Sequence, residues 1–445
     1  MHKPKHELAA EYQEAVEQAI AMARHAGASA AEASIGFQTG LSVGVRMGEI
    51  ETLEYHRDKG LSITVYHGQR RGSASTSDLR KAALSATVEA AGRIAKYTAE
   101  DVYSGLAERE RLAWQYPDLD LHHPWAISAE QATELALTCE QAGRDVDARI
   151  TNSEGASVST HESYHAYGNS HDFYGAYAAS RHGLSCALIG QAGEDMQRDY
   201  WYTSARQAQI LEDAASVGRH AAQRAIARLA AKRLSTRVAP VIFAADVASS
   251  LFSHYTRAVS GGSLYRKSSF LLDSLDKAVF PAWMNIEEQP HLHGGLGSSP
   301  FDSEGVATRP SHLVKEGRVS RYILDTYSAR KMNMHTTGNA GGTHNVIVQS
   351  NHGTLDDMLK DMGTGLLVTE LMGQGVNIVT GDYSRGAAGF WVENGALQYP
   401  VHEITIAGDL PGIFRDIVAV GSDVDRRRSL HTGSVWLARM TIAGE

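Results

Sequence analysis

The sequence predicts an α+β protein with two domains. Residues 1–235 are expected to form antiparallel sheets with packed helices, and residues 236–445 a glycine-rich, mostly β domain. In the first half, stretches with helical spacing of apolar residues alternate with stretches in which every second residue is apolar. In the last quarter, eight glycines fall between Gly363 and Gly395 among short apolar runs, a density typical of turns and bulges in a β-sheet.

Residues 1–100 contain the first unit of the N-terminal domain. A helix is predicted over Glu7–His25, because apolar residues recur about every four positions. Three alternating segments follow, and they are Glu32–Gln38, Gly40–Met47 and Gly60–Tyr66. A second helix is predicted from about Asp78 to Tyr97. The order of these elements indicates an antiparallel sheet with helices packed on one side.

Residues 126–235 contain the second unit, and the polar, proline-bearing segment Tyr103–Trp125 is predicted to be a linker. Ser128 followed by Gln131 matches a capping box, in which the two side chains satisfy free backbone donors at the start of a helix. Asp145–Tyr202 is strand-like with intervening turns, and a long helix is predicted over Ala205–Leu234.

The C-terminal domain is expected to begin after a boundary at Ser235–Pro240. Val241–Phe243 is a predicted strand, and Asp246–Val259 is a predicted helix. A further short helix is predicted over Leu355–Met362, which Thr354 would cap. Asn394-Gly395 between two apolar runs predicts a β-hairpin, because these residues accept the two positive φ angles of a type I′ turn.

The segment Gly381–Gly389 is predicted to be a loop at the centre of the C-terminal sheet. Its candidate functional residues combine charge, an aromatic ring and a flexible backbone, and they are Gly381, Asp382, Tyr383, Ser384, Arg385 and Gly386. Such a loop suits docking of a peptide or a partner, and a glycine-edged sheet can accept an added peptide strand. An equally supported alternative is a buried Asp382–Arg385 pair that only holds the loop in place.

The composition argues against several classes of protein. A net charge of −9 and a pI near 6.2 argue against a nucleic-acid groove, which needs a basic face. The basic run Arg426–Arg428 is predicted to be a solvated helix end. Two cysteines, Cys139 and Cys186, form no disulfide framework, which suits a reducing cytoplasm. With no apolar signal region and no run of about eighteen apolar residues, neither secretion nor membrane insertion is expected.

Motifs spread over the C-terminal half carry a family resemblance. They are GGSLYRKSSFLLD (Gly261–Asp273), PFDSEG (Pro300–Gly305), HTTGNAGG (His335–Gly342), ELMGQG (Glu370–Gly375), GDYSRGAAGFWVENG (Gly381–Gly395) and YPVHEITIAG (Tyr399–Gly408). Together they resemble the TldD/PmbA proteins, specifically the TldE (PmbA) branch. The resemblance implies a cytoplasmic peptidase of bacteria and archaea, in which a zinc-bearing TldD subunit pairs with TldE. Such a complex cleaves unfolded peptides or leader peptides, including those of modified peptide antibiotics and an antitoxin.

The resemblance also implies where a zinc site would lie. TldD relatives carry H-E-x-x-x-H on the helix after the strand that matches Val241–Phe243, and a cysteine before a glycine near the C-terminus. In this chain Ser253, His254 and Ala258 occupy the helical positions, and Thr432 occupies the cysteine position. Because serine, alanine and threonine are not usual zinc ligands, this chain is expected to bind no zinc, and zinc is expected in a TldD-like partner. His254 remains a candidate, either as a structural residue or as part of a shared cavity.

His161-Glu162-Ser163-Tyr164-His165 spells H-E-x-x-H, in which two histidines one helical turn apart bind zinc. The neighbouring residues favour a strand over a helix. In a strand His161 and His165 share a face but lie ~13 Å apart, while Glu162 points the opposite way. An autonomous zinc peptidase that uses these three residues is therefore the less favoured alternative. A further alternative is a non-enzymatic, peptide-binding regulatory homodimer.

Two other motifs have competing interpretations. Ser328-x-x-Lys331 matches the S-x-x-K of penicillin-interacting enzymes, but Thr336 stands where their second motif needs a lysine. The loop His335–Gly342 is either an anion-binding nest of backbone donors, a connection between strands or a contact between subunits.

Overall fold

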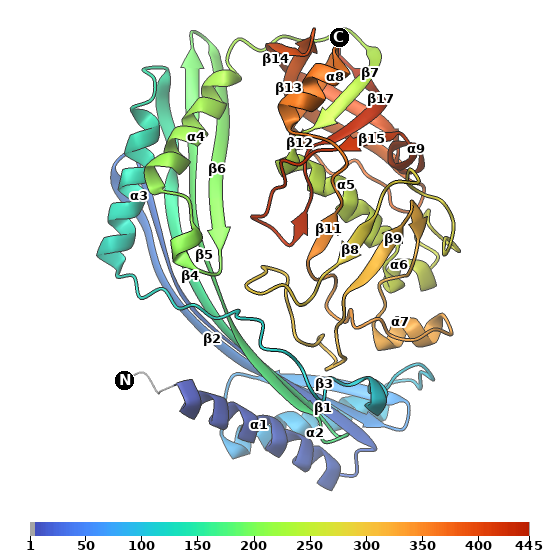
Figure 1. Ribbon diagram of the computed structural model, residues 1–445. Helices are drawn as coiled ribbons and strands as arrows, with labels where there is room; N and C mark the ends of the chain where they lie inside the picture. The colour runs from blue at the N-terminus through green and yellow to red at the C-terminus, as the bar shows by residue number, and fades with distance from the viewer. Residues whose placement is uncertain (1–4, 445) are drawn as a thin grey trace.

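The computed structural model describes residues 5–444 and confirms the predicted α+β fold class (Figure 1). The N-terminal half forms one curved, six-stranded antiparallel sheet with the strand order β3-β2-β1-β4-β5-β6. Its strands are β1 (Ala30–Arg46), β2 (Glu49–His67), β3 (Arg70–Thr76), β4 (Ile150–Asn169), β5 (Tyr174–Ala192) and β6 (Asp195–Ala205). The sheet curves around the C-terminal half of the chain, which faces its concave side (Figure 1).

Helices cover the other face of this sheet, and they are α1 (Lys5–His25), α2 (Lys81–Tyr97), α3 (Ala129–Arg144) and α4 (Ala214–Ala227). Odd-numbered apolar residues of β1 point toward these helices, because side chains alternate along a strand. Ile35 packs in a core with α1 and α2, whereas Val43 packs in a core with α3 and α4. The concave face carries polar residues of β4 such as Ser157 and His161, so it forms a polar wall.

Several element boundaries differ from the predictions. β1 is one continuous strand, although the alternation predicts two separate segments. β2 begins at Glu49 rather than Gly60. The prediction missed residues 49–59 because they are largely exposed and lack the apolar alternation of a half-buried strand. The helix predicted over 205–234 is shorter, because the Asp213 side chain accepts the N–H of Ser216 and caps α4 there.

The C-terminal half contains two further sheets that share a core. The six-stranded sheet has the order β14-β13-β12-β7-β17-β15, with β7 (Arg237–Phe243), β12 (Gly365–Met372), β13 (Asp382–Glu393), β14 (Ala396–Asp409), β15 (Ile417–Val420) and β17 (Val435–Ala443). The five-stranded sheet has the order β10-β9-β8-β11-β16, with β8 (Ile286–Glu288), β9 (Ser311–Lys315), β10 (Arg318–Val319), β11 (Val346–Val348) and β16 (Leu430–His431).

One long and several short helices pack on these sheets, and they are α5 (Ala245–Ala258), α6 (Gly261–Tyr265), α7 (Thr326–Lys331), α8 (Leu355–Met362) and α9 (Leu410–Arg415). Phe252 and Tyr255 of α5 are wholly buried in the shared core. Their burial fixes the rotation of α5, so that the helix turns its polar side toward the N-terminal sheet.

The prediction of a loop over Gly381–Gly389 is wrong. Asp382–Glu393 forms β13, an interior strand paired with β12 and β14. A Cβ atom at Gly389 would lie 1.8 Å from the carbonyl oxygen of Leu367, and the pairing with β14 shifts register between Ala387 and Gly389. The glycines here therefore reflect close strand packing and a bulge. The hairpin turn at Asn394-Gly395 is confirmed, with φ angles of 52° and 74°.

Short-range capping signals are confirmed, whereas one charge pattern is not. The capping boxes at the starts of α3 and α8 are both present. Arg426–Arg428 is not a helix end, since the guanidinium of Arg427 lies 4.0 Å from the ring centroid of Trp201 and pairs with Asp425 at 2.9 Å. Because Trp201 is distant in sequence, the basic run by itself does not reveal this contact.

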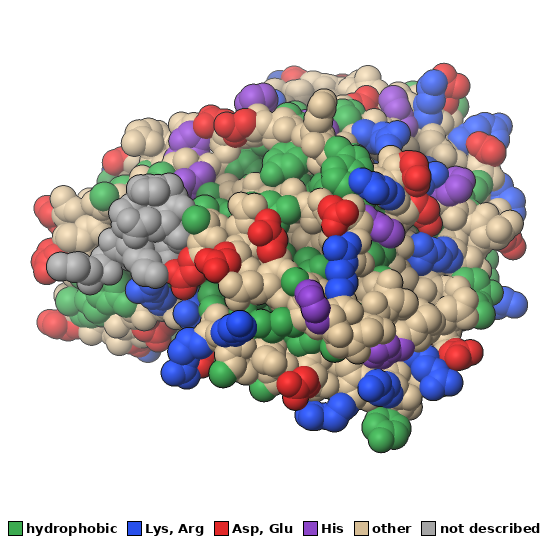
Figure 2. Space-filling model, turned by 90° about the horizontal axis from the view of Figure 1, so that it is seen from below, with side chains coloured by type: hydrophobic (Ala, Val, Ile, Leu, Met, Phe, Trp, Pro, Cys, Tyr) green, Lys and Arg blue, Asp and Glu red, His purple; other side chains and the backbone are tan. Residues whose placement is uncertain are grey.

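On the face shown in Figure 2, acidic and basic side chains are interspersed, without a continuous basic patch. Among residues 5–444 there is no helix whose length and hydropathy would let it cross a membrane.

Candidate functional site

A polar cavity of about 390 Å³ lies where α5, β12 and β13 of the C-terminal half face β6 and α4 of the N-terminal half. Ser253 and His254 from α5, Glu370 from β12, Arg385 from β13 and Arg228 at the end of α4 are among its lining residues. We call it the His254 cavity. The sequence places Ser253 and His254 in one candidate site and Arg385 in another, and the fold brings all three to this cavity.

His254 is held in a neutral state. Its ring contacts Tyr383 edge to face, with 6.1 Å between ring centroids. Burial lowers the pKa of His254 to about 4, with further contributions from the positive charges of Arg385 and Arg257. Within the described residues, neither the buried Nε2 of His254 nor the buried hydroxyl of Tyr383 has a hydrogen-bond partner. His254 therefore presents an uncharged and unsatisfied imidazole.

β13 sorts the predicted loop residues onto two faces. Tyr383 and Arg385 share one face, toward α5, because side chains alternate along a strand. Asp382 and Ser384 point the opposite way and are exposed, and the Asp382 carboxylate accepts a hydrogen bond from Thr380 at 2.5 Å. The alternative of a buried Asp382–Arg385 pair is therefore wrong.

Ion pairs cross the cavity between the two halves of the chain. Arg224 of α4 pairs with Asp199 of β6 and with Asp246 of α5, at 3.1 Å in both cases. Arg228 pairs with Asp199 at 3.5 Å and also with Glu370 of β12. Burial raises the pKa of Asp246, although Arg224 opposes that effect. These pairs fix the position of α4 relative to α5.

The residues at the implied zinc positions do not fit a zinc ion. Ser253 is exposed at the cavity, whereas Ala258 is wholly buried in the core. Thr432 is also wholly buried, and its hydroxyl donates to the carbonyl oxygen of Gly433 at 3.0 Å. In the described part of the chain, no three or more His, Cys, Asp or Glu residues are grouped so that they could hold a metal ion.

The H-E-x-x-H sequence lies in β4, which confirms its interpretation as a polar strand face. His161 Nδ1 lies 2.9 Å from Nε2 of His56, and Gly40 stands between them on β1, where a Cβ atom would collide with the His56 ring. Glu162 points to the opposite face and lies 2.9 Å from Nε2 of His122. The ring of His165 packs on aromatic residues instead. The three side chains thus have different neighbours.

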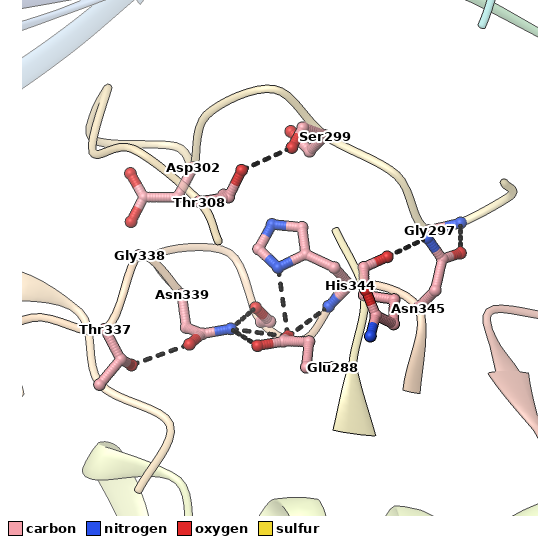
Figure 3. Close-up of polar contacts among 12 residues, drawn as sticks. Glu288, Gly297, Ser299, Asp302, Thr308, Thr337, Gly338, Asn339, His344 and Asn345 are labelled. Atoms are coloured by element: carbon pink, nitrogen blue, oxygen red, sulfur yellow. Dashed lines mark hydrogen bonds and ion pairs between the residues drawn. The ribbon is translucent and has the colours of Figure 1, made fainter. Parts of the chain in front are cut away.

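A second cavity, of about 460 Å³, lies between the concave sheet and the His335–Gly342 loop, and His161, His165 and His344 line it. Figure 3 shows Glu288 as the centre of the hydrogen bonds beneath this loop. Glu288 accepts hydrogen bonds from the Asn339 amide at 2.9 Å and from the backbone N–H of His344 at 2.7 Å, and it also pairs with Arg321. Burial would raise the pKa of Glu288, but His344 and Arg321 outweigh it and lower that pKa.

Internal hydrogen bonds satisfy polar groups of the two remaining motifs, the His335–Gly342 loop and the S-x-x-K sequence. The N–H of Ala340 donates to Asp302, and the N–H of Gly342 donates to the carbonyl oxygen of Asn339, which favours a connecting role for the glycine-rich loop. Ser328 of the S-x-x-K sequence is buried, and its hydroxyl donates to the Asp325 carboxylate at 2.6 Å. This serine therefore has a structural partner at the start of α7.

Two acids of the PFDSEG segment, the buried Asp302 and the partly buried Glu304, predict an unusual pH dependence. Burial raises the pKa of Asp302 to about 6 and, together with the nearby charge of Asp302, that of Glu304 to about 7. The folded chain therefore holds protons that the unfolded chain has lost between about pH 4 and pH 7. We expect the free energy of unfolding to fall as pH rises through this window.

The variant Glu304→Gln isolates this contribution. Its loss of stability between about pH 4.5 and pH 7.5 is expected to be roughly 2 kcal/mol smaller than that of the unchanged protein, because glutamine does not ionise. Denaturant titrations at several pH values measure this difference. A variant with the same pH dependence as the unchanged protein would contradict the prediction.

Sequence profiles of one family match the chain in three consecutive segments. PmbA/TldA metallopeptidase domain 1 matches residues 31–95, the central domain matches residues 122–229, and the C-terminal domain matches residues 236–444. The Metalloprotease PmbA of Escherichia coli O157:H7 is 50% identical over 433 residues, which cover 97% of this chain and 96% of that protein. This chain belongs to the PmbA/TldD metallopeptidase family.

Within the PmbA/TldD family, the chain lies on the PmbA side, as its motifs predict. A Metalloprotease PmbA homolog of Haemophilus influenzae is 50% identical over 435 residues, covering 98% of this chain and 96% of that protein. A Metalloprotease TldD homolog of the same organism is only 22% identical over 412 residues, covering 85% and 83%. The family therefore contains both kinds of protein, and this chain is much more similar to PmbA.

Solved structures show the same PmbA/TldD fold. A proposed modulator of DNA gyrase from Bacteroides thetaiotaomicron aligns with a TM-score of 0.93 at 27% identity, covering 97% of this chain and 99% of that chain. TldE from Thermococcus kodakarensis aligns with a TM-score of 0.85 at 18% identity, covering 97% and 100%. At 18% identity, the likeness to TldE from Thermococcus kodakarensis is evidence for a shared fold only.

Sequence reasoning missed the ion pairs of the His254 cavity. Arg224 and Arg228 are four residues apart on α4, a spacing that places both on one helix face. That spacing can be read from the sequence, but it does not reveal the acidic partners, because Asp199, Asp246 and Glu370 lie on three other elements. Only the packing of β6, α5 and β12 against α4 brings these charges together.

Proposed function

We propose that this chain is the TldE-type subunit of a cytoplasmic TldD–TldE peptidase, and that it holds no catalytic zinc of its own. The observation that carries the proposal is the state of the three ligand positions. Ser253 faces the His254 cavity without a metal-binding side chain, Ala258 is packed in the core, and Thr432 is wholly buried. Such side chains provide no donor set for zinc. In this proposal a TldD-like partner supplies the zinc and the general base for peptide-bond hydrolysis.

This chain would complete a chamber that holds unfolded or leader peptides. Two features support that role. The concave face of the N-terminal sheet is polar, and a cavity of about 460 Å³ lies between it and the C-terminal half. The His254 cavity, of about 390 Å³, lies where the edge strand β6 and α4 meet the C-terminal half. An extended peptide has free backbone donors and acceptors, and polar walls can satisfy them at little cost.

The test uses the whole chain, alone and together with the TldD-like subunit of its own host. Alone, the chain is expected to contain far less than one zinc per molecule by mass spectrometry and to leave an unfolded protein substrate intact. With the partner, it is expected to co-elute in gel filtration and to increase cleavage above that of the partner alone.

Other outcomes would support the alternatives. One tightly bound zinc per chain, lost in His161→Ala, with peptidase activity of the isolated chain, would establish the autonomous enzyme built on His161, Glu162 and His165. Stable self-association without any binding of the TldD-like subunit would favour the peptide-binding homodimer.

A further inference from the structure

We propose that the His254 cavity binds a carboxylate group of a peptide, with Arg385 as its principal anchor. That the ligand is a peptide rests on the proposed function. That the ligand is an anion rests on the charges and unpaired polar atoms of the cavity itself.

The cavity has more guanidinium groups than carboxylates. Among its lining residues are five arginines and three acids, and they are Arg198, Arg224, Arg228, Arg385, Arg428, Asp199, Asp246 and Glu370. This positive excess occurs in a chain whose net charge is −9. An anion is therefore favoured in this cavity over a metal ion or an amine.

All three acids are already paired with arginines. Asp199 and Asp246 bind Arg224, and Glu370 binds Arg228. Arg198 pairs with Glu154, which lies outside the cavity lining. Within residues 5–444, none of the ion pairs of these three acids includes Arg385 or Arg428.

Arg385 is the least satisfied of these cations. Within residues 5–444 it forms no ion pair, and its Nε–H is buried without a hydrogen-bond acceptor. A buried donor without a partner costs free energy, and a guanidinium matches a carboxylate with two parallel N–H···O bonds. A bound carboxylate would remove the penalty at Arg385. Arg428 differs, because its Nε donates to the Tyr202 hydroxyl at 2.8 Å.

His254 is suited to be the second contact for the same ligand. Its Nε2 is buried and unpartnered, and it lines the same cavity as Arg385. The neutral imidazole with hydrogen on Nε2 donates a hydrogen bond to an anionic oxygen without adding a further positive charge beside Arg385. Ser253 is less suited, because its hydroxyl already donates to the carbonyl oxygen of Ser249 at 3.0 Å.

The carboxylate of a peptide has two sources, the C-terminus and an Asp or Glu side chain. Three probes distinguish them by calorimetric titration of the isolated full chain: N-acetyl-trialanine, its C-terminal amide, and N-acetyl-Ala-Glu-Ala amide. We expect the free acid to bind at least about tenfold more tightly than its amide. If the glutamate peptide also binds, the site accepts either source, and if it does not, the site reads the C-terminus.

Two variants of Arg385 and one control variant test whether Arg385 is the principal anchor of the carboxylate. Arg385→Gln is expected to weaken binding of the free acid by about ten- to a hundredfold. Arg385→Lys keeps the charge but loses the planar guanidinium, so an intermediate loss of affinity for the free acid is expected. This variant replaces Arg385→Gln in the test if the glutamine variant does not fold. Arg439→Gln is the matched control, since this exposed arginine pairs with Asp416 and does not line the cavity.

The proposal is overturned if neither N-acetyl-trialanine nor N-acetyl-Ala-Glu-Ala amide binds more tightly than N-acetyl-trialanine amide, if the folded Arg385 variants bind as tightly as the unchanged protein, or if no probe binds at about 10 mM. These measurements need no partner subunit. Failure to bind a TldD-like protein would therefore refute the proposed function without changing their outcome.

Discussion

Replacing Glu288 with glutamine is expected to lower the free energy of unfolding by about 3 kcal/mol or more. Glu288 is 2% exposed and accepts hydrogen bonds from Asn339 and His344 (Figure 3). It also forms an ion pair with Arg321. Glutamine keeps the shape of the side chain but removes its charge. The largely buried guanidinium of Arg321 then remains without a carboxylate, and leaving one partner of a buried ion pair alone is strongly destabilising.

Denaturant titration followed by tryptophan fluorescence measures this loss. The neighbouring Glu287→Gln is the matched control, because Glu287 is 40% exposed and pairs with the exposed His312, so a loss below about 1 kcal/mol is expected. The double variant Glu288→Gln/Arg321→Gln is expected to lose less than the sum of the single variants, because it leaves no unpaired charge. Equal losses at Glu287 and Glu288 would show that the buried network contributes little.

Replacing Gly218 with alanine is expected to lower the free energy of unfolding by about 2 kcal/mol. Gly218 lies where α4 crosses α3, and its Cβ atom would stand 1.8 Å from the carbonyl oxygen of Cys139. Gly143 faces it from α3, where a Cβ atom would lie 2.6 Å from the carbonyl oxygen of Gly218. Backbone atoms cannot yield as a flexible side chain does, so the two helices would have to separate.

Gly92→Ala in α2 is the matched control for a glycine inside a helix. The nearest atom to its Cβ outside the helix backbone is Nε2 of His67, at 4.0 Å. Alanine there is expected to raise the free energy of unfolding by up to about 1 kcal/mol, because it favours the helix more than glycine does. Thermal or denaturant unfolding compares the two variants. A Gly218→Ala protein as stable as Gly92→Ala would contradict the steric argument.

The elements that the sequence predicts well depend on neighbours close in the chain. The capping box at Ser128 and the Asn394-Gly395 turn both involve residues within a few positions of each other. The strand that carries His161 and His165 likewise follows from local propensity, and this was enough to set aside a helical zinc motif. Family membership could be inferred from motifs alone, because several of them occur in register.

Contacts between distant segments determine the features that the sequence does not predict, namely the strand β13 and the composition of the His254 cavity. The glycines of Gly381–Gly389 predict a loop, yet the segment is a strand because β12 and β14 pair with it on either side. The stabilising hydrogen bonds therefore involve strands outside the segment. That strand turns Arg385 toward His254 and Asp382 away from it. No local pattern contains this information. The fold class and the family can be inferred from the sequence alone, because residue identity and short-range geometry suffice for these. Which charges share a cavity depends on the packing of distant elements and cannot be read from the spacing of residues in the sequence.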